Sequence, residues 1–304
     1  MSEKKHICVC VCTYKRPQLI KRLLVKLQNQ SVDGLFTFSV VVVDNDLNLS
    51  AKLTVNEVKE KSIISIDYHS EPEQNISLAR NKAIENSTGD FIAFIDDDEF
   101  PTPGWLVNLF NAYHKYEADA VLGPVKPHFD APTPRWLIKS KLCERKSYKS
   151  GTILNWKQTR TGNVLLDRDI FKNKNNRFEP EFGRTGGGDN RFFRQISEQG
   201  RIIVWCNEAI VYETVVPKRW KKLFYIKKFL RIGGLTGKLK KKREPLYIIR
   251  FISAFFFYML LLPFSPLFGQ HLFMRFLLKI VYYFGCISGY FGYVFIKNRD
   301  DSYV

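Results

Sequence analysis

The chain has 304 residues, which is long enough for one large or two small domains with a sizeable core. Its formal charge of +17 is unevenly distributed: residues 1–215 contain 30 Lys and Arg against 27 Asp and Glu, whereas residues 216–304 contain 17 against 3. A nucleic-acid-binding protein would carry its basic excess on a folded domain, and the motifs of RNA-binding domains are absent. Basic residues beside long apolar runs instead indicate a tail that contacts a membrane.

Strand and helix patterns alternate over the first 120 residues. The continuous apolar strands predict an α/β fold with a doubly wound, mostly parallel sheet, in which ligands bind beyond the carboxyl ends of the strands. Residues 120–215 are less regular. The strands are expected at 7–12, 38–43, 63–68, 91–95, 161–166 and 201–206, and the helices after Pro17, Ser50, Ser77, Pro103 and Asp189.

Three cysteines, Cys8, Cys10 and Cys12, alternate with apolar residues in the first strand. On a strand their sulfurs share one face about 6–7 Å apart, too far for an easy disulfide. They also lack the convergent spacing of a zinc site, so we expect reduced, buried packing residues. Together with an N-terminal stretch without a signal-peptide apolar region, this predicts a cytoplasmic location.

An acidic block, Asp96 to Glu99, follows the strand expected at 91–95. Oxygen ligands without sulfur suit Mg²⁺ or Mn²⁺, with phosphate completing the coordination. A solvated acidic turn is the alternative.

Three further polar residues lie near expected strand ends or helix starts. Asp44 ends the second strand, where it could accept from a nucleobase or ribose, or cap a helix. Arg80 could pair with Asp44, contact the base or phosphate, or form a structural ion pair. Asp189 follows three glycines at a helix start, where it is either an N-cap or a general base.

The order of these motifs resembles that of family 2 glycosyltransferases with the GT-A fold, and most of all the bacterial exopolysaccharide glucosyltransferases of the succinoglycan type. The resemblance covers roughly residues 5–220. It is carried by Cys10–Pro17, Val43-Asp44-Asn45, Gln74-Asn75-Ile76, Ala79-Arg80-Asn81, Asp96–Pro101, Thr161–Val164, Gly187-Gly188-Asp189 and Val204–Ala209.

The resemblance implies a UDP-sugar donor and a role for each matching residue. Asp98 would be the direct ligand of Mn²⁺ or Mg²⁺, with Asp96 serving the ribose and metal and Glu213 as a third ligand. Asp189 would be the catalytic base, although Gly188 stands where the family usually has Glu. With one base and no obvious nucleophile, a single displacement with inversion is expected. Asp44 and Arg80 would hold the uracil end of the donor. The remaining nucleotide-sugar-binding residues would be Thr13, Tyr14, Arg16 and Asp97.

The tail completes the predicted organisation. We expect a catalytic domain at 1–215, a basic amphipathic segment at 216–250 and apolar membrane-associated helices at 251–304, which either span the bilayer or lie in its interface. The acceptor would be a polyprenyl-diphosphate-linked saccharide, at the cytoplasmic face of a bacterial inner membrane. A non-catalytic membrane adaptor with a degenerate nucleotide-sugar fold and a metal-dependent phosphohydrolase are the alternative functions.

Overall fold

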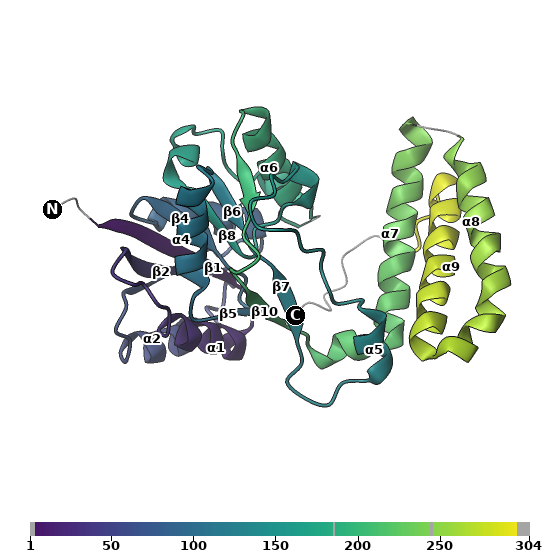
Figure 1. Cartoon of the computed structure of the whole chain (residues 1–304), viewed down its shortest axis with the longest axis horizontal. Helices are drawn as coiled ribbons and strands as arrows, with labels where there is room; N and C mark the ends of the chain where they lie inside the picture. Colours follow the sequence, from purple (N-terminus) through teal and green to yellow (C-terminus); the bar gives the residue numbers. More distant parts are fainter. Residues whose placement is uncertain (1–3, 185, 244–245, 297–304) are drawn as a thin grey trace. The chain divides into compact units, whose positions relative to one another are not determined.

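The computed structural model describes residues 4–184, 186–243 and 246–296. The chain divides into two compact units, each built from two stretches of sequence (Figure 1). Of the described residues, those within 4–127 and 145–214 form the first unit, and those within 128–144 and 215–296 form the second. The segment 128–144 therefore belongs to the same unit as the C-terminal helices, although the sequence pattern groups it with the catalytic residues.

A large sheet forms the centre of the first unit, with the strand order β3-β2-β1-β4-β8-β6-β9. β8 runs antiparallel to both of its neighbours, and the other adjacent strands are parallel. The predicted doubly wound, mostly parallel α/β sheet is thus confirmed. The strands are β1 (Lys5–Thr13), β2 (Phe36–Asp44), β3 (Ile66–Ser70), β4 (Phe91–Phe94), β6 (Ala120–Leu122), β8 (Val164–Asp167) and β9 (Ile203–Trp205).

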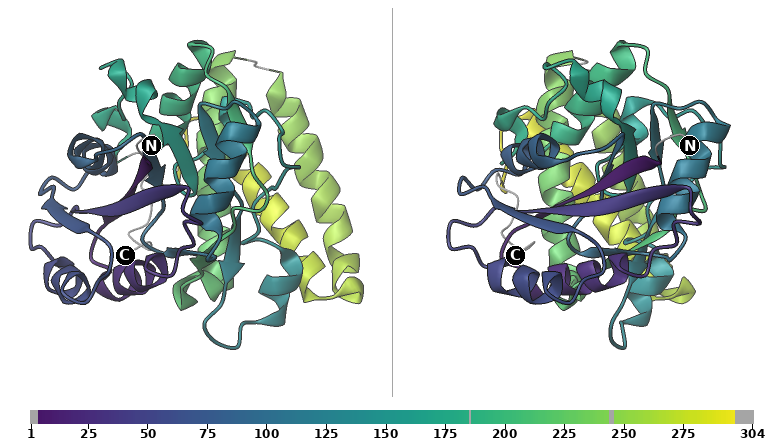
Figure 2. Two further views of the ribbon diagram at one scale, coloured as in Figure 1. Left: turned by 60° about the vertical axis from the view of Figure 1, so that its left-hand side comes forward. Right: turned by 90° about the vertical axis from the view of Figure 1, so that its left-hand side faces the viewer.

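Two apolar cores lie on opposite faces of this sheet, because successive side chains of a strand point to opposite sides. Ile7 and Val9 of β1 pack into one core with α1, α2 and α4, and Cys8 and Cys10 pack into the other with α3 and α6. Figure 2 shows helices on both faces of the sheet. Cys8 and Cys10 are buried, Cys12 is partly buried, and none of the three is in a disulfide, as expected for packing residues of the first strand. The helices are α1 (Pro17–Leu27), α2 (Lys52–Lys59), α3 (Ile76–Asn86), α4 (Trp105–Lys115) and α6 (Gly188–Glu198).

The start of α3 differs from the sequence expectation. Asn75, rather than Ser77, caps this helix, since its Oδ1 accepts from the backbone N–H groups of Ser77 and Leu78 at 3.1 and 3.4 Å. Both residue types are good caps, so local sequence does not decide between them. The backbone N–H of Asn75 also donates to Asn45 Oδ1 at 2.9 Å, which fixes the helix start beside the end of β2.

A small second sheet, with the order β5-β10-β7, adds two acidic residues to the same region. In its register Glu213 of β10 lies opposite Glu99 of β5. Asp98 precedes β5, and its carbonyl accepts from the N–H of Thr214 at 2.8 Å. The strands are β5 (Glu99–Pro101), β7 (Val125–His128) and β10 (Val211–Thr214).

The second unit is helical. Its core contains Trp136 and Leu137 of α5, Tyr225 of α7, and Met274 and Leu278 of α9. Phe224, Ile226 and Phe229, which belong to the segment predicted as basic and amphipathic, pack against this core. The helices are α5 (Arg135–Ser140), α7 (Lys222–Arg243), α8 (Tyr247–Leu261), the 3₁₀ segment η5 (Leu262–Phe268) and α9 (Gln270–Tyr290).

Glycines bring the backbones of α7 and α9 into direct contact. A Cβ atom added to Gly233 would lie 2.1 Å from the carbonyl oxygen of Tyr282, and one added to Gly237 would lie 2.0 Å from that of Cys286. A step of four residues along α7, from 233 to 237, corresponds to a step of four residues in the same direction along α9, from 282 to 286. The two helices therefore run parallel. By length and composition, the stretches 247–268 and 270–290 could each cross a membrane.

Candidate active site

The acidic block follows β4 and meets the end of the neighbouring strand β1. Asp97 is the innermost of its aspartates: Oδ2 accepts from Thr13 Oγ1 and Oδ1 accepts from Arg16 Nη1, both at 2.8 Å. The same Nη1 lies 3.3 Å from Asp98 Oδ2. Asp97 therefore connects β1 and the start of α1 to the acidic block, and Asp98 keeps one oxygen outside these contacts.

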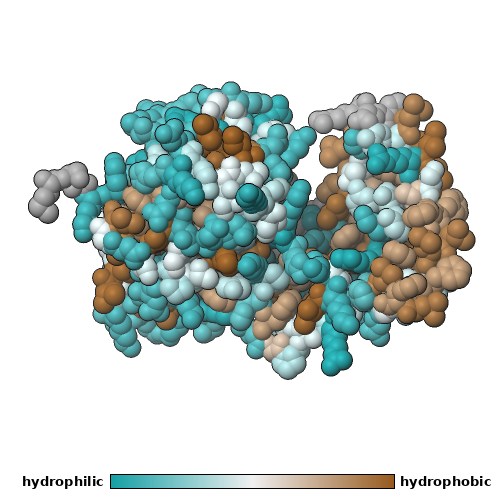
Figure 3. All heavy atoms as spheres, viewed as in Figure 1, coloured by the Kyte–Doolittle hydropathy of each residue, from teal (hydrophilic) through white to brown (hydrophobic). Residues whose placement is uncertain are grey.

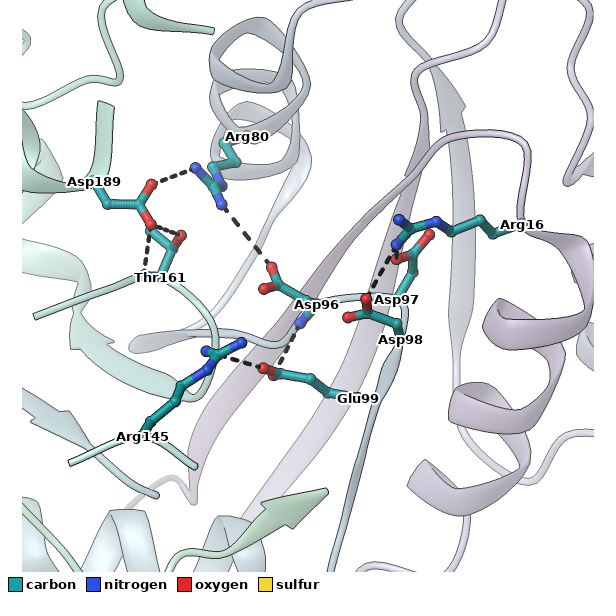
Figure 4. A network of polar contacts seen from close by, with 9 residues as sticks. All are labelled: Arg16, Arg80, Asp96, Asp97, Asp98, Glu99, Arg145, Thr161 and Asp189. Atoms are coloured by element: carbon teal, nitrogen blue, oxygen red, sulfur yellow. Dashed lines mark hydrogen bonds and ion pairs between the residues drawn. The ribbon is translucent and has the colours of Figure 1, made fainter. Parts of the chain in front are cut away.

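Arg80 joins the acidic block to Asp189. Its Nη1 donates to Asp189 Oδ1 at 2.6 Å, and its Nη2 lies 3.9 Å from Asp96 Oδ1 (Figure 4). Asp189 Oδ2 accepts from both the backbone N–H and the hydroxyl of Thr161, at 3.3 and 3.0 Å. Residues far apart in sequence thus place two carboxylates on either side of one guanidinium group.

The position of Asp189 excludes the helix-cap alternative. The N-cap of α6 is Gly187, with φ of +100°, a residue without a side chain that could hydrogen-bond to the helix start. Asp189 lies in the first turn and is directed to Arg80 and Thr161 instead. A left-handed glycine allows the chain to turn sharply into the helix at this point.

A third arginine approaches the block from the far side. Arg145 Nη2 donates to Glu213 Oε2 at 2.6 Å, and its Nη1 lies 3.9 Å from Glu99 Oε1. Glu99 is completely buried, and its Oε2 accepts from the N–H of Asp96 at 3.3 Å. Gly162 must be small here, because a Cβ atom would lie 2.9 Å from both Asp96 Oδ2 and Glu99 Oε1.

The remaining predicted residues lie at the ends of β1 and β2. Tyr14 is partly exposed in the β1–α1 connection, with Lys15 Nζ 5.0 Å from its ring centroid. Asp44 is completely buried and accepts from the N–H groups of Asp46 and Ala51 and from the Tyr68 hydroxyl at 3.0 Å. Asp44 therefore organises the loop after β2, and Arg80 does not pair with it but with Asp189 and Asp96.

The pKa values of these carboxyl groups shift in different directions: those of Asp98 and Glu99 are raised, and that of Asp189 is lowered. Burial, and then the neighbouring Asp97 and Asp96, raise the pKa of Asp98 to about 7. Burial also raises the pKa of Glu99 well above its ordinary value. For Asp189 burial acts upward, but the charge of Arg80 and the hydrogen bonds from Thr161 outweigh it and lower the pKa, so this carboxylate is ionised at neutral pH.

The described residues contain no group of three or more His, Cys, Asp and Glu side chains arranged to hold a metal ion. Glu213, expected as a third ligand, is paired with Arg145. Asp96 and Asp98 remain accessible, with 44% and 16% of their side-chain surface exposed. Two carboxylates fit a hard cation that takes its other ligands from phosphate and water.

Two contributors were missed from sequence. Arg145 lies in a basic loop, Glu144-Arg145-Lys146, whose composition gives no sign of its partner. Thr161 belongs to a motif that carries the family resemblance, but nothing in that motif indicated its bonds to Asp189. The available signal was the position of Thr161 next to Gly162, because a glycine can mark a place where the backbone closely approaches another group.

Comparisons with known proteins agree with this geometry. The glycosyl transferase family 2 model matches residues 8–181. The succinoglycan biosynthesis protein ExoM of Rhizobium meliloti is 36% identical over 243 residues, which cover 78% of this chain and 76% of that protein.

The structure of S. aureus TarS 1-349 in complex with UDP superposes with a TM-score of 0.53 at 16% identity, covering 98% of this chain and 95% of that one. The complex of the same protein with UDP-GlcNAc gives 0.52 at 19% identity, over 69% of this chain and 59% of that one. These structural matches establish a GT-A fold.

Proposed function

Because the chain belongs to glycosyl transferase family 2 and is a glycosyltransferase, we propose that it transfers a sugar from a UDP-sugar, with inversion and with the help of Mn²⁺ or Mg²⁺, to a polyprenyl-diphosphate-linked saccharide. The pathway would be the synthesis of a bacterial surface polysaccharide. The UDP and UDP-GlcNAc complexes of TarS support the donor class, and the similarity to the succinoglycan biosynthesis protein ExoM supports the pathway.

The observation that carries the proposal is the bridge that Arg80 makes between Asp189 and Asp96, at 2.6 and 3.9 Å. It brings a candidate base and the acidic block into one polar network at the carboxyl ends of the strands. Donor diphosphate and acceptor hydroxyl must meet at such a place for transfer. Since Arg80 reaches Asp189 and not Asp44, a role for Arg80 at the reacting centre is better supported than one at the uracil end.

Charge balance supports a divalent cation. Arg160 also belongs to this cluster, because the charges of Glu99, Glu213 and Asp96 act on its guanidinium group. Counted in their fully ionised forms, six carboxylates outnumber four guanidinium groups by two: the carboxylates of Asp96, Asp97, Asp98, Glu99, Asp189 and Glu213, and the guanidinium groups of Arg16, Arg80, Arg145 and Arg160. Asp98 and Asp96 would hold the cation, which would supply electrostatic stabilisation of the leaving diphosphate.

The proposed chemistry is a single displacement. The acceptor oxygen forms a bond to the anomeric carbon as the bond to the diphosphate oxygen breaks, and the hydroxyl proton passes to Asp189. Arg80 and Thr161 orient this carboxylate and keep it ionised before the reaction. Arg16, which pairs with Asp97 and Asp98, would compensate negative charge that develops on UDP.

The acceptor and location follow from the second unit. Residues 216–304 combine 17 basic and 3 acidic residues with two stretches that are apolar and long enough for a membrane. We propose that this unit anchors the enzyme at the cytoplasmic face of the inner membrane, where lipid-linked acceptors are available, and that it contributes no catalytic residue.

Product analysis tests the proposal. Purified enzyme in lipid would be given a panel of UDP-sugars, Mn²⁺ or Mg²⁺, and a polyprenyl-diphosphate saccharide, with mass spectrometry to identify the product and NMR to assign its anomeric configuration. One added hexose, with a configuration opposite to that of the donor, is expected. Transfer with retention, or full turnover after removal of divalent cations by EDTA, would contradict it.

A further inference from the structure

We propose that the second unit binds an anionic phospholipid leaflet in plane, with α8 and η5 in the interface of one leaflet, so that neither 247–268 nor 270–290 crosses the bilayer. The inference rests on the membrane association proposed above. It concerns the mode of that association, which length and composition leave open.

One side of α8 and η5 is exposed and free of charged residues. Ile249, Phe256 and Leu260, at spacings that place them on one face of a helix, are 62%, 63% and 71% exposed. Phe251 and Tyr258, on the opposite side, are buried and partly buried. Figure 3 shows apolar side chains gathered over this helix. The exposed apolar face comprises Ile249, Ile252, Phe256, Phe257, Met259, Leu260, Phe264, Leu267 and Phe268.

The packing of α8 on α9 opposes a spanning arrangement. Tyr258 is at the middle of the stretch 247–268, and its ring lies 5.7 Å from that of Phe276 and 5.9 Å from that of Tyr283. Lys279 lies one helical turn from each of these partners and is exposed. If α8 crossed the bilayer, Lys279 would sit at the level of the hydrocarbon centre, where charged side chains are rare and costly.

α9 also cannot enter the bilayer without α7. The backbones of the two helices touch at Gly233 and Gly237, so they move together. α7 carries Lys227, Lys228 and Arg231 before this contact and Lys238 after it. Its exposed apolar residues, such as Leu235 and Leu239, flank Lys238 and do not form an uncharged face.

Charge complementarity identifies the occupant as an anionic leaflet. At the start of α8, Lys240 Nζ lies 4.1 Å and the Arg250 guanidinium carbon 5.7 Å from the ring centroid of Tyr247. A tyrosine and two cations at the boundary of an apolar face match the headgroup level of a membrane. The apolar face would enter the acyl boundary while the basic residues meet anionic headgroups.

Depth measurements on the full-length protein distinguish the two modes. Single cysteines at Ile249, Phe256, Leu260 and Leu267 would carry an environment-sensitive fluorophore, since the native cysteines are buried or only partly exposed. Quenching would be measured with nitroxide lipids of graded depth, in phosphatidylcholine vesicles with and without about 30% phosphatidylglycerol. All four labels should lie at one shallow depth, about 5–10 Å below the headgroups, and binding should be tighter with phosphatidylglycerol.

Two controls make the outcome unambiguous. A cysteine at Lys279 should react with a membrane-impermeant maleimide as fast as one at Lys52, which is exposed on α2 of the first unit. Phe256 and Leu260 near the bilayer centre, with Ile249 and Leu267 near opposite surfaces and Lys279 protected, would overturn the in-plane mode but not the anchoring. Absence of any lipid contact would overturn both, whereas UDP-sugar binding by the first unit, measured separately, would be unaffected.

Discussion

Arg80 and Asp189 share a hydrogen bond of 2.6 Å that joins helix α3 to the first turn of helix α6. The guanidinium group also lies over the ring of Phe178, with its carbon 5.3 Å from the ring centroid, so its orientation is fixed from a second side. A carboxylate held in this way is ionised and directed, which is what a general base needs before its substrate arrives.

Asp189→Asn should separate binding from chemistry. The amide keeps the shape of the side chain but cannot take a proton, so kcat should fall by roughly 10²–10⁴ while UDP-sugar affinity is retained. Single-turnover kinetics and calorimetric binding of the donor check this. Near-normal kcat with a lower melting temperature would assign Asp189 a structural role only.

Arg80→Gln should shift the pH dependence of turnover. Arg80 lowers the pKa of Asp189, so its loss raises that pKa. A base works when it is deprotonated, and activity is therefore present above the pKa and lost as pH falls through it. The acid limb of the kcat profile should move to higher pH. Arg191→Gln is the matched control, because Arg191 lies on α6 with Asp189 but pairs with Glu179 at the surface. An unmoved acid limb would contradict the assignment.

Asp98→Asn should remove activity without removing stability. In the absence of a cation, burial and the neighbouring aspartates raise the pKa of Asp98 to about 7. The ionised form therefore destabilises the fold above the ordinary carboxyl pKa, and an amide relieves this. Melting temperature without metal should be unchanged or higher, whereas Mn²⁺-dependent donor binding should be lost. Asp97→Asn should instead lower the melting temperature, because Asp97 bonds to Thr13 and Arg16.

Much of the first unit could be read from sequence because its signals are local. Continuous apolar strands ending in Asp44 and in the acidic block predict where strands stop and ligands bind, and the motif order identifies the family. Asp189 illustrates the limit. From sequence, an aspartate just after glycines at a helix start can be an N-cap. Its hydrogen bonds to Arg80 and Thr161, which lie in distant segments of the sequence, show that Asp189 has a different role.

The parts that sequence did not predict depend on long-range packing. Glu213 was expected at the metal, but the loop that begins after residue 144 brings Arg145 to it. Similarly, α7 reads as an independent amphipathic helix, because nothing local reveals that Gly233 and Gly237 face the backbone of α9. Contacts between segments that are far apart in the sequence leave no periodic pattern of residues from which they could be predicted.

Gly237→Ala should loosen the second unit alone. The new Cβ atom would lie 2.0 Å from the carbonyl oxygen of Cys286, so α7 and α9 must separate, at a cost of about 1–3 kcal/mol or more. Gly234→Ala is the control on the same helix, since the nearest atom to its Cβ would be Cγ1 of Val294 at 3.3 Å. Tryptic cleavage within α7 should accelerate for the first variant, and UDP-sugar binding should not change. Equal protease resistance of both variants would show that the helices do not pack through their backbones.

Leu260→Glu combined with Phe257→Glu should convert a detergent-released protein into a salt-released one. Apolar burial contributes about 25 cal/mol per Å² and is not screened by ions, whereas each Lys or Arg at an anionic surface contributes about 1 kcal/mol that salt weakens. High salt should therefore leave the parent protein on the membrane, and detergent should remove it.

The double variant loses two of the most exposed apolar side chains of α8, which are 71% and 57% exposed, and places charges in the acyl boundary. The basic residues of α7 would then hold it alone, and about 1 M salt, where the Debye length is about 3 Å, should release it. Leu53→Glu, at an 80% exposed position on α2, is the matched control and should behave as the parent. Parent protein that stays soluble and unaggregated without detergent would refute the anchor, and a double variant that resists salt would show that α8 is not the face in contact with lipid.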